Sequence, residues 1–168
     1  VTGPHFLKLF TDFLCDFPEV RLEVQSTTRH VDLLADGVDV AVRIGPVEDK
    51  DLVVRRIHTD RTIVVASPDY LATAGTPERA EDLKKHRCIV GFAGSWTPRC
   101  DWPLIKGGTV TVGSRLSANE ITLIREAALD GLGCALVGSA VVASDIEAGR
   151  LTPLLIDQVG AELPVSLV

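Results

Sequence analysis

Short apolar strands that run directly into turns are the feature that most constrains how this chain folds. Residues 38–44 are mostly apolar and end at Gly45, and residues 61–66 end in the same way at Ser67 and Pro68. Helical patterns lie between such strands, and alternating strands and helices predict an α/β fold with largely parallel sheets and helices on both faces. Apolar strands with polar ends also suit a binding site placed where strands stop and loops begin.

Helices are predicted from apolar residues spaced three and four apart and from the residues that begin or end such a pattern. Residues 5–16 show this spacing, and Pro18 ends the pattern. Ser117 and Glu120 match a capping box, so we expect a helix that runs from there to Gly131. Further helices are expected over residues 29–35, from Pro68 onward, in a short stretch after Thr76, and over residues 141–148.

Strands are predicted where apolar and polar side chains alternate or where a short apolar run lies between turns. Residues 20–25 alternate valine and leucine with arginine, glutamate and glutamine. Further strands are expected over residues 38–44, 52–57, 61–66, 88–92, 109–116, 151–155 and 164–168.

Charge and composition limit the partners of this chain. The 168 residues carry a net charge of −6 and the pI is near 5.2, so they offer no electrostatic attraction for DNA. The apolar runs are far too short to span a bilayer. The four cysteines, Cys15, Cys88, Cys100 and Cys134, lack the paired spacing of a zinc site or a disulfide framework. We therefore expect reduced thiols in a cytoplasmic protein.

No motif of an enzyme is complete in this sequence. Ser95 and Ser114 each follow a glycine but lack the second glycine of a nucleophile elbow. Gly131 and Gly133 follow a helix and open a strand, the reverse of a dinucleotide-binding turn. The four histidines fall in different elements, without the spacing of metal ligands. We therefore expect a chain without catalytic residues, metal or cofactor.

Four segments, in chain order, resemble one family of bacterial proteins. They are residues 18–20 (Pro-Glu-Val), 31–33 (Val-Asp-Leu), 37–43 (Gly-Val-Asp-Val-Ala-Val-Arg) and 66–71 (Ala-Ser-Pro-Asp-Tyr-Leu). Together they are similar to the effector-binding domain of LysR-type transcription regulators. The resemblance covers nearly the whole chain and implies a two-lobed, type 2 periplasmic-binding-protein-like fold in which two strands cross between the lobes.

The resemblance also implies domain boundaries. Lobe one would comprise residues 1–65 and 164–168, and lobe two residues 66–163, with crossings near residues 65–67 and 162–165. A repeated pattern supports two lobes of related design, because an Asp-Gly helix end precedes an apolar strand both at Gly37 and at Gly131. The family's first strand, its final helix and its N-terminal winged helix-turn-helix DNA-binding domain are absent. We therefore expect this sequence to be part of a longer protein.

A cleft between the lobes is the binding site that the resemblance implies. Backbone N–H groups at helix N-termini suit a carboxylate, and Arg43 at a strand end suits an anion. The alternatives are an ion pair for Arg43, simple helix capping for Ser117 and Thr28, and core packing for Phe92. The candidate effector-binding residues are Thr2, Gly3, Ser26, Thr27, Thr28, Arg43, Ser67, Phe92, Ser117 and Asn119.

The leading hypothesis is a domain that senses a small effector, possibly bearing a carboxylate, for a LysR-type regulator. The resemblance implies a homodimer, a tetramer in the full-length protein, and DNA contact only through the absent N-terminal domain. Its interface would use residues 5–16, 20–25 and 120–129. The alternative is a solute-binding protein of a transport system, against which four unpaired cysteines count. An α/β enzyme is a third possibility, without a supporting motif.

Overall fold

The computed structural model describes residues 4–27, 33, 36–47, 52–92 and 97–168, and it confirms the α/β class. The helices are α1 (Pro4–Asp16), α2 (Pro68–Ala74), η1 (Ala80–Lys85, a 3-10 helix), α3 (Ile121–Leu129) and α4 (Ser139–Glu147). The strands are β1 (Val42–Ile44), β2 (Arg55–Ala66), β3 (Cys88–Gly91), β4 (Asp101–Pro103), β5 (Thr109–Thr111), β6 (Ser114–Ala118), β7 (Cys134–Gly138), β8 (Thr152–Leu154) and β9 (Glu162–Leu167).

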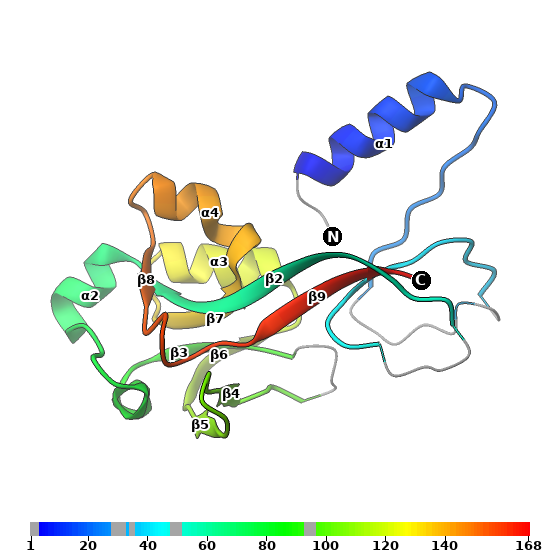
Figure 1. Ribbon diagram of the computed structural model, residues 1–168. Coiled ribbons are helices and arrows are strands. Elements are labelled where there is room, and N and C mark those ends of the chain that lie inside the picture. The colour runs from blue at the N-terminus through cyan, green and yellow to red at the C-terminus, as the bar shows by residue number, and fades with distance from the viewer. Residues whose placement is uncertain (1–3, 28–32, 34–35, 48–51, 93–96) are drawn as a thin grey trace.

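Two long strands, β2 and β9, run side by side and connect the two lobes (Figure 1). The main sheet has the order β1-β9-β2-β7-β3-β6, with β8 also paired to β2, while β4 and β5 form a separate pair. β2 pairs with β9 over residues 55–61 and with β7 and β8 over residues 62–66. The sheet is therefore mixed: β3 is parallel to β6 and β7, and the connecting strands are antiparallel to their neighbours.

The core of lobe two has one cluster on each face of the sheet, because successive residues of a strand point to opposite faces. Val64 packs with Leu83 of η1 on one face. Val65, on the other face, packs with Ile124 of α3 and Val142 of α4. Burying a side chain of this size contributes roughly 1.5–3 kcal/mol. This packing fixes α3 and α4 on one face of the sheet, where both helices start from strand ends (Figure 1).

Several strand predictions need correction. The strand predicted over residues 109–116 is interrupted after Thr111, and its two parts, β5 and β6, belong to different sheets. Residues 20–25 form an exposed segment that is not assigned to a strand, since alternation shows which side chains could face a core but supplies no partner strand. β1 begins at Val42 rather than at residue 38. The two strands predicted over residues 52–57 and 61–66 are one strand, because the polar residues between them pair with β9 in an exposed part of the ladder.

The helix predictions agree with the structure more closely, although the observed helices begin or end at somewhat different residues. The helix predicted over residues 5–16 is confirmed as α1, and the stretch after Thr76 forms only the 3-10 helix η1. The helix predicted over residues 29–35 lies mostly outside the described residues. Among the described residues, none of the helices has the length and apolar character needed to cross a bilayer.

β2 pairs with β9 as far as Arg61 and with β7 from Thr62 onward. This point lies a few residues before the predicted lobe boundary at residue 65. The boundary itself stays a prediction, as do the limits of lobe two at residues 66 and 163.

Candidate functional site at the strand crossing

Three parallel strands of lobe two end at the same edge of the sheet. β3, β6 and β7 run in one direction. The residue directly after each strand is Phe92 for β3, Asn119 for β6 and Ser139 for β7. β2 passes this edge at Thr62, which pairs with Gly138 at the end of β7. We call this edge, defined by these five residues, the crossing edge. Ligands of open α/β sheets bind outside the carboxyl ends of parallel strands, so the crossing edge is the candidate site.

Lobe one directs a strand end toward the crossing edge. β9 leaves the crossing edge and enters lobe one, and β1 runs antiparallel to it with Arg43 opposite Ser166. The N–H of Gly45, just after β1, donates to the carbonyl of Pro164 at 2.8 Å. The half-buried Arg43 therefore lies on a strand whose carboxyl end points back to the crossing.

The N-terminus of α3, at the crossing edge, is capped by Glu120. The Glu120 carboxylate accepts a hydrogen bond from the N–H of Leu123 at 2.8 Å. Backbone hydrogen bonds, from Thr122 first and Leu123 second, hold the pKa of Glu120 below its usual range. A protein carboxylate therefore already occupies the position that the sequence suggested for an anionic ligand.

The predicted capping box at Ser117 is wrong. Ser117 lies within β6, which continues to Ala118 because it stays paired with Gly91 of β3. The Ser117 hydroxyl shares a hydrogen bond of 2.6 Å with the hydroxyl of Ser114. Helical backbone can begin only after the ladder ends, so the cap moves to Glu120.

We expect Glu120→Ala to lower the free energy of unfolding by about 1 kcal/mol, because it leaves the first N–H groups of α3 without an acceptor. Because the pKa of folded Glu120 is lowered, its contribution is present above the unfolded pKa of about 4.3 and is lost as the pH falls. Urea unfolding at pH 7 and pH 3 measures both effects. Ser117→Ala is the matched control, and we expect it to change the free energy of unfolding by less than about 0.5 kcal/mol. A larger loss of stability for Ser117→Ala than for Glu120→Ala would indicate that Ser117 caps α3 after all.

The N-terminus of α4 is capped from another element. The hydroxyl of Ser139 donates to the carboxylate of Asp60 in β2, and the N–H of Ala140 donates to the same carboxylate at 3.2 Å. Gly138, the residue before α4, brings no capping side chain. Sequence reasoning missed Asp60 because it was placed between two strands rather than inside one. α4 begins at Ser139, two residues before the helix predicted over residues 141–148, so the position of the cap was not predicted either.

The remaining predicted site residues are spread over the chain. Phe92 is half-buried at the crossing edge, and Asn119 is exposed there. Ser26 and Thr27 are exposed in the segment after α1. Thr2, Gly3 and Thr28 lie outside the described residues.

Ser67, expected at the hinge, lies elsewhere. β2 passes the crossing edge at Thr62 and ends at Ala66, so Ser67 is at the opposite edge of lobe two. It is buried, and its hydroxyl accepts a hydrogen bond from the N–H of Tyr70 at 3.3 Å as the cap of α2. The predicted start of a helix at Ser67 and Pro68 is confirmed, whereas the expected place of Ser67 at the crossing is not.

The family model described as the LysR substrate binding domain matches residues 1–168. The chain belongs to this family. The LysR-type regulator CrgA of Neisseria meningitidis serogroup C (strain 8013) is 34% identical over 152 residues, which are 89% of this chain and 50% of that protein. The chain spans about half the length of the curated relatives it matches.

Solved structures of LysR-type regulators share the fold. The structure of CrgA from Neisseria meningitidis has a TM-score of 0.84 and 30% identity, over 97% of this chain and 56% of that one. The full-length structure of AphB, a virulence activator of Vibrio cholerae, has a TM-score of 0.83 and 28% identity, over 96% and 55% of the two chains. These comparisons confirm the two-lobed, periplasmic-binding-protein-like fold and a LysR-type sensing domain rather than a solute-binding protein of a transporter.

Proposed function

We propose that this LysR substrate binding domain senses a small polar effector at the crossing edge, between its two lobes. The observation that carries the proposal is the convergence of strand ends there. The carboxyl ends of β3, β6 and β7 meet at the crossing edge, and the carboxyl end of β1 points toward it from lobe one. α3 and α4 also begin there, so backbone N–H groups face the same region.

Arg43 of lobe one favours an effector that bears a carboxylate. Glu120 and Asp60 already satisfy N–H groups of the two helix N-termini, so we expect the effector's carboxylate to bind Arg43 rather than these N–H groups. Arg43 supplies a positive charge from lobe one. An effector that binds one arrangement of the lobes more tightly than another shifts the population toward that arrangement.

The proposal extends to the longer protein. The relatives are named as transcriptional regulators of about twice this length, and these residues carry a net charge of −6. We therefore place DNA contact in an N-terminal winged helix-turn-helix domain outside this sequence, in a cytoplasmic regulator without catalytic activity.

A thermal-shift screen of small carboxylates and polar metabolites against the 168-residue chain tests the effector site. A ligand at a hundred times its Kd stabilises the folded state by about 2.7 kcal/mol. For a domain of this size, each kcal/mol raises Tm by roughly 2–4 °C. We expect an effector to raise Tm, and Arg43→Gln to weaken its binding about tenfold because a charge-assisted hydrogen bond is lost.

Arg55→Gln is the matched control. Arg55 pairs with Leu167 and Arg43 with Ser166, and adjacent residues of β9 point to opposite faces, so the two arginines lie on opposite faces of the same sheet. Arg55→Gln removes the same charge and should leave effector affinity unchanged. Equal losses in the two variants would indicate a general charge effect and would overturn the proposed site.

We also propose that the chain forms a homodimer through α1 and the segment that follows it. Figure 1 shows α1 standing apart from the sheet, and its apolar residues Leu9, Phe13 and Leu14 are exposed. Phe17 continues this apolar surface beyond the helix, and its ring centroid lies 5.0 Å from that of Phe13. Exposed apolar surface of this kind favours burial against a partner.

We expect the double variant Leu9→Glu, Phe13→Glu to raise the dimer dissociation constant at least about tenfold, because each change buries a charge in the interface. Sedimentation velocity over a concentration series measures it. Val53→Glu is the control, since Val53 is 89% exposed and lies outside α1. A wild-type chain that stays monomeric throughout the series would contradict the dimer.

A further inference from the structure

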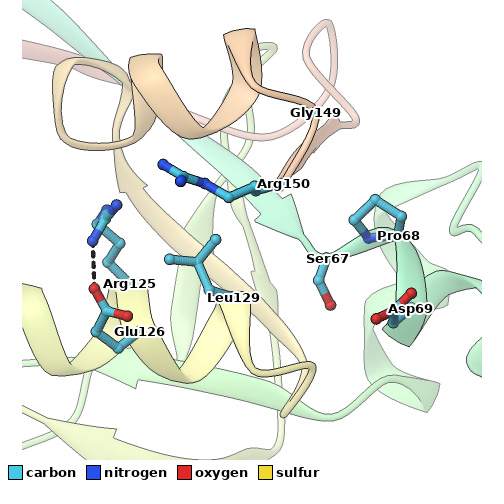
Figure 2. Close-up of a pocket in the computed structure, with 8 residues that line it drawn as sticks. All are labelled: Ser67, Pro68, Asp69, Arg125, Glu126, Leu129, Gly149 and Arg150. Atoms are coloured by element: carbon cyan, nitrogen blue, oxygen red, sulfur yellow. Dashed lines mark hydrogen bonds and ion pairs between the residues drawn. The ribbon is translucent and has the colours of Figure 1, made fainter.

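A pocket lies at the opposite edge of lobe two from the crossing edge (Figure 2). Its volume is about 540 Å³, and it lies among the start of α2, the second half of α3 and the turn after α4. α3 and α4 both begin at the crossing edge, so this pocket beside their later turns is separate from the site proposed above. The residues that decide its chemistry are Pro68, Asp69, Arg125, Glu126, Leu129 and Arg150.

Two arginines of this pocket are held in place by one buried carboxylate. Asp145 is fully buried, and it accepts hydrogen bonds from Arg125 Nε at 2.6 Å and from Arg150 Nη2 at 2.6 Å. The hydrogen bonds and charges of the arginines, Arg125 first, lower the pKa of Asp145. Guanidinium groups fixed in this way lose little side-chain freedom when they bind a carboxylate. Among the described residues, the hydrogen bonds of Arg150 use its Nε and Nη2, which leaves Nη1 for such a contact.

The facing wall carries the opposite charge. Asp69 lies in the first turn of α2 and is exposed. In Figure 2, Leu129 lies between the two arginines and the Pro68–Asp69 turn, so an apolar stretch separates positive from negative groups. Glu126 forms an ion pair with Arg125, which leaves Arg150 as the main positive group of the pocket.

We propose that this pocket binds a small aminocarboxylic acid. Its carboxylate binds Nη1 of Arg150, its ammonium group binds Asp69, and the methylene groups between them lie on Leu129 and Pro68. A simple anion meets the carboxylates of Asp69 and Glu126, and a simple cation meets the two arginines, so the charge pattern favours a ligand with both charges. This proposal does not depend on the effector site, because the two sites share no residue.

Three probes of matched length test the charge requirement: 5-aminovalerate, valerate and pentylamine. Titration of the isotope-labelled 168-residue chain, followed through backbone amide signals in proton–nitrogen correlation spectra, measures where and how tightly each one binds. We expect 5-aminovalerate to shift the amide signals of Ser67, Asp69 and residues 125–129 and 149–150. It should bind about tenfold more tightly than either singly charged probe, because each of them lacks one charge-assisted contact.

Asp69→Asn should weaken 5-aminovalerate binding about tenfold and leave valerate binding unchanged or tighter. Asp157→Asn, which changes an exposed aspartate that does not line the pocket, is the matched control and should have no effect. Arg43→Gln should also have no effect, which separates this pocket from the effector site. The proposal would be overturned by equal affinity for the three probes or by the absence of any saturable shift. It would also be overturned by signal shifts confined to the crossing edge, or by an Asp69→Asn variant that binds 5-aminovalerate as tightly as the wild type.

Discussion

Asp145→Asn is expected to lower the free energy of unfolding by about 3 kcal/mol, because removing one partner of a buried ion pair leaves uncompensated charge. Asp145 is fully buried and holds Arg125 of α3 and Arg150 beyond α4. The side chain of Arg125 is 23% exposed and would keep only its ion pair with the exposed Glu126, so the loss of the buried carboxylate is compensated only in part. Urea unfolding followed by the fluorescence of the buried Trp102 measures the loss.

Arg150→Gln is the matched variant for this network. The side chain of Arg150 is 57% exposed and Arg125 still neutralises Asp145, so the expected loss is about 1 kcal/mol or less. The pKa of folded Asp145 is lowered, so the contribution of its charge is present above an unfolded pKa of about 3.9 and is lost as the pH falls. Equal stability of wild type and Asp145→Asn at pH 7 would show that the arginines relax into solvent instead.

Features that depend on neighbouring residues could be predicted from the sequence. The helical spacing of residues 5–16 gave α1, and Ser67 followed by Pro68 correctly marked the start of α2, since a cap and a first-turn proline act within one turn. The general expectation of a site where strands stop and loops begin agrees with the common edge at which β3, β6 and β7 end, whereas the individual site residues stay predictions.

Features that depend on distant pairing could not be predicted in this way. Ser117 and Glu120 have the spacing of a capping box, yet the pairing of β6 with β3 keeps Ser117 in a strand. Asp60 caps α4 from 79 positions earlier in the chain, so no local pattern reveals it. Ser67 was misplaced for a related reason: the length of β2, which carries Ser67 past the crossing, follows from its pairing with β7, β8 and β9.

Gly160→Ala is expected to cost at least about 3 kcal/mol in unfolding free energy, the range of strong backbone strain combined with a steric clash. Gly160 precedes β9 with φ of 140°, and a Cβ atom there would lie 2.3 Å from the carbonyl oxygen of Thr62. The next residue, Ala161, exchanges hydrogen bonds with Thr62, whose N–H donates to the Ala161 carbonyl at 2.8 Å. The variant must therefore separate β9 from β2 at the point where both strands pass the crossing edge.

Gly149→Ala is the control that separates the clash with Thr62 from the strain of a positive φ angle. Gly149 has φ of 69°, and a Cβ atom there would have no heavy atom within 4 Å, so the expected loss is only the strain of the left-handed backbone, about 1–2 kcal/mol. The difference between the two variants in urea unfolding measures the close approach of the strands. If that approach sets the arrangement of the lobes, Gly160→Ala also weakens effector binding while Gly149→Ala does not. Equal losses of stability in the two variants would show that the crossing adjusts to an added methyl group and does not fix the lobes.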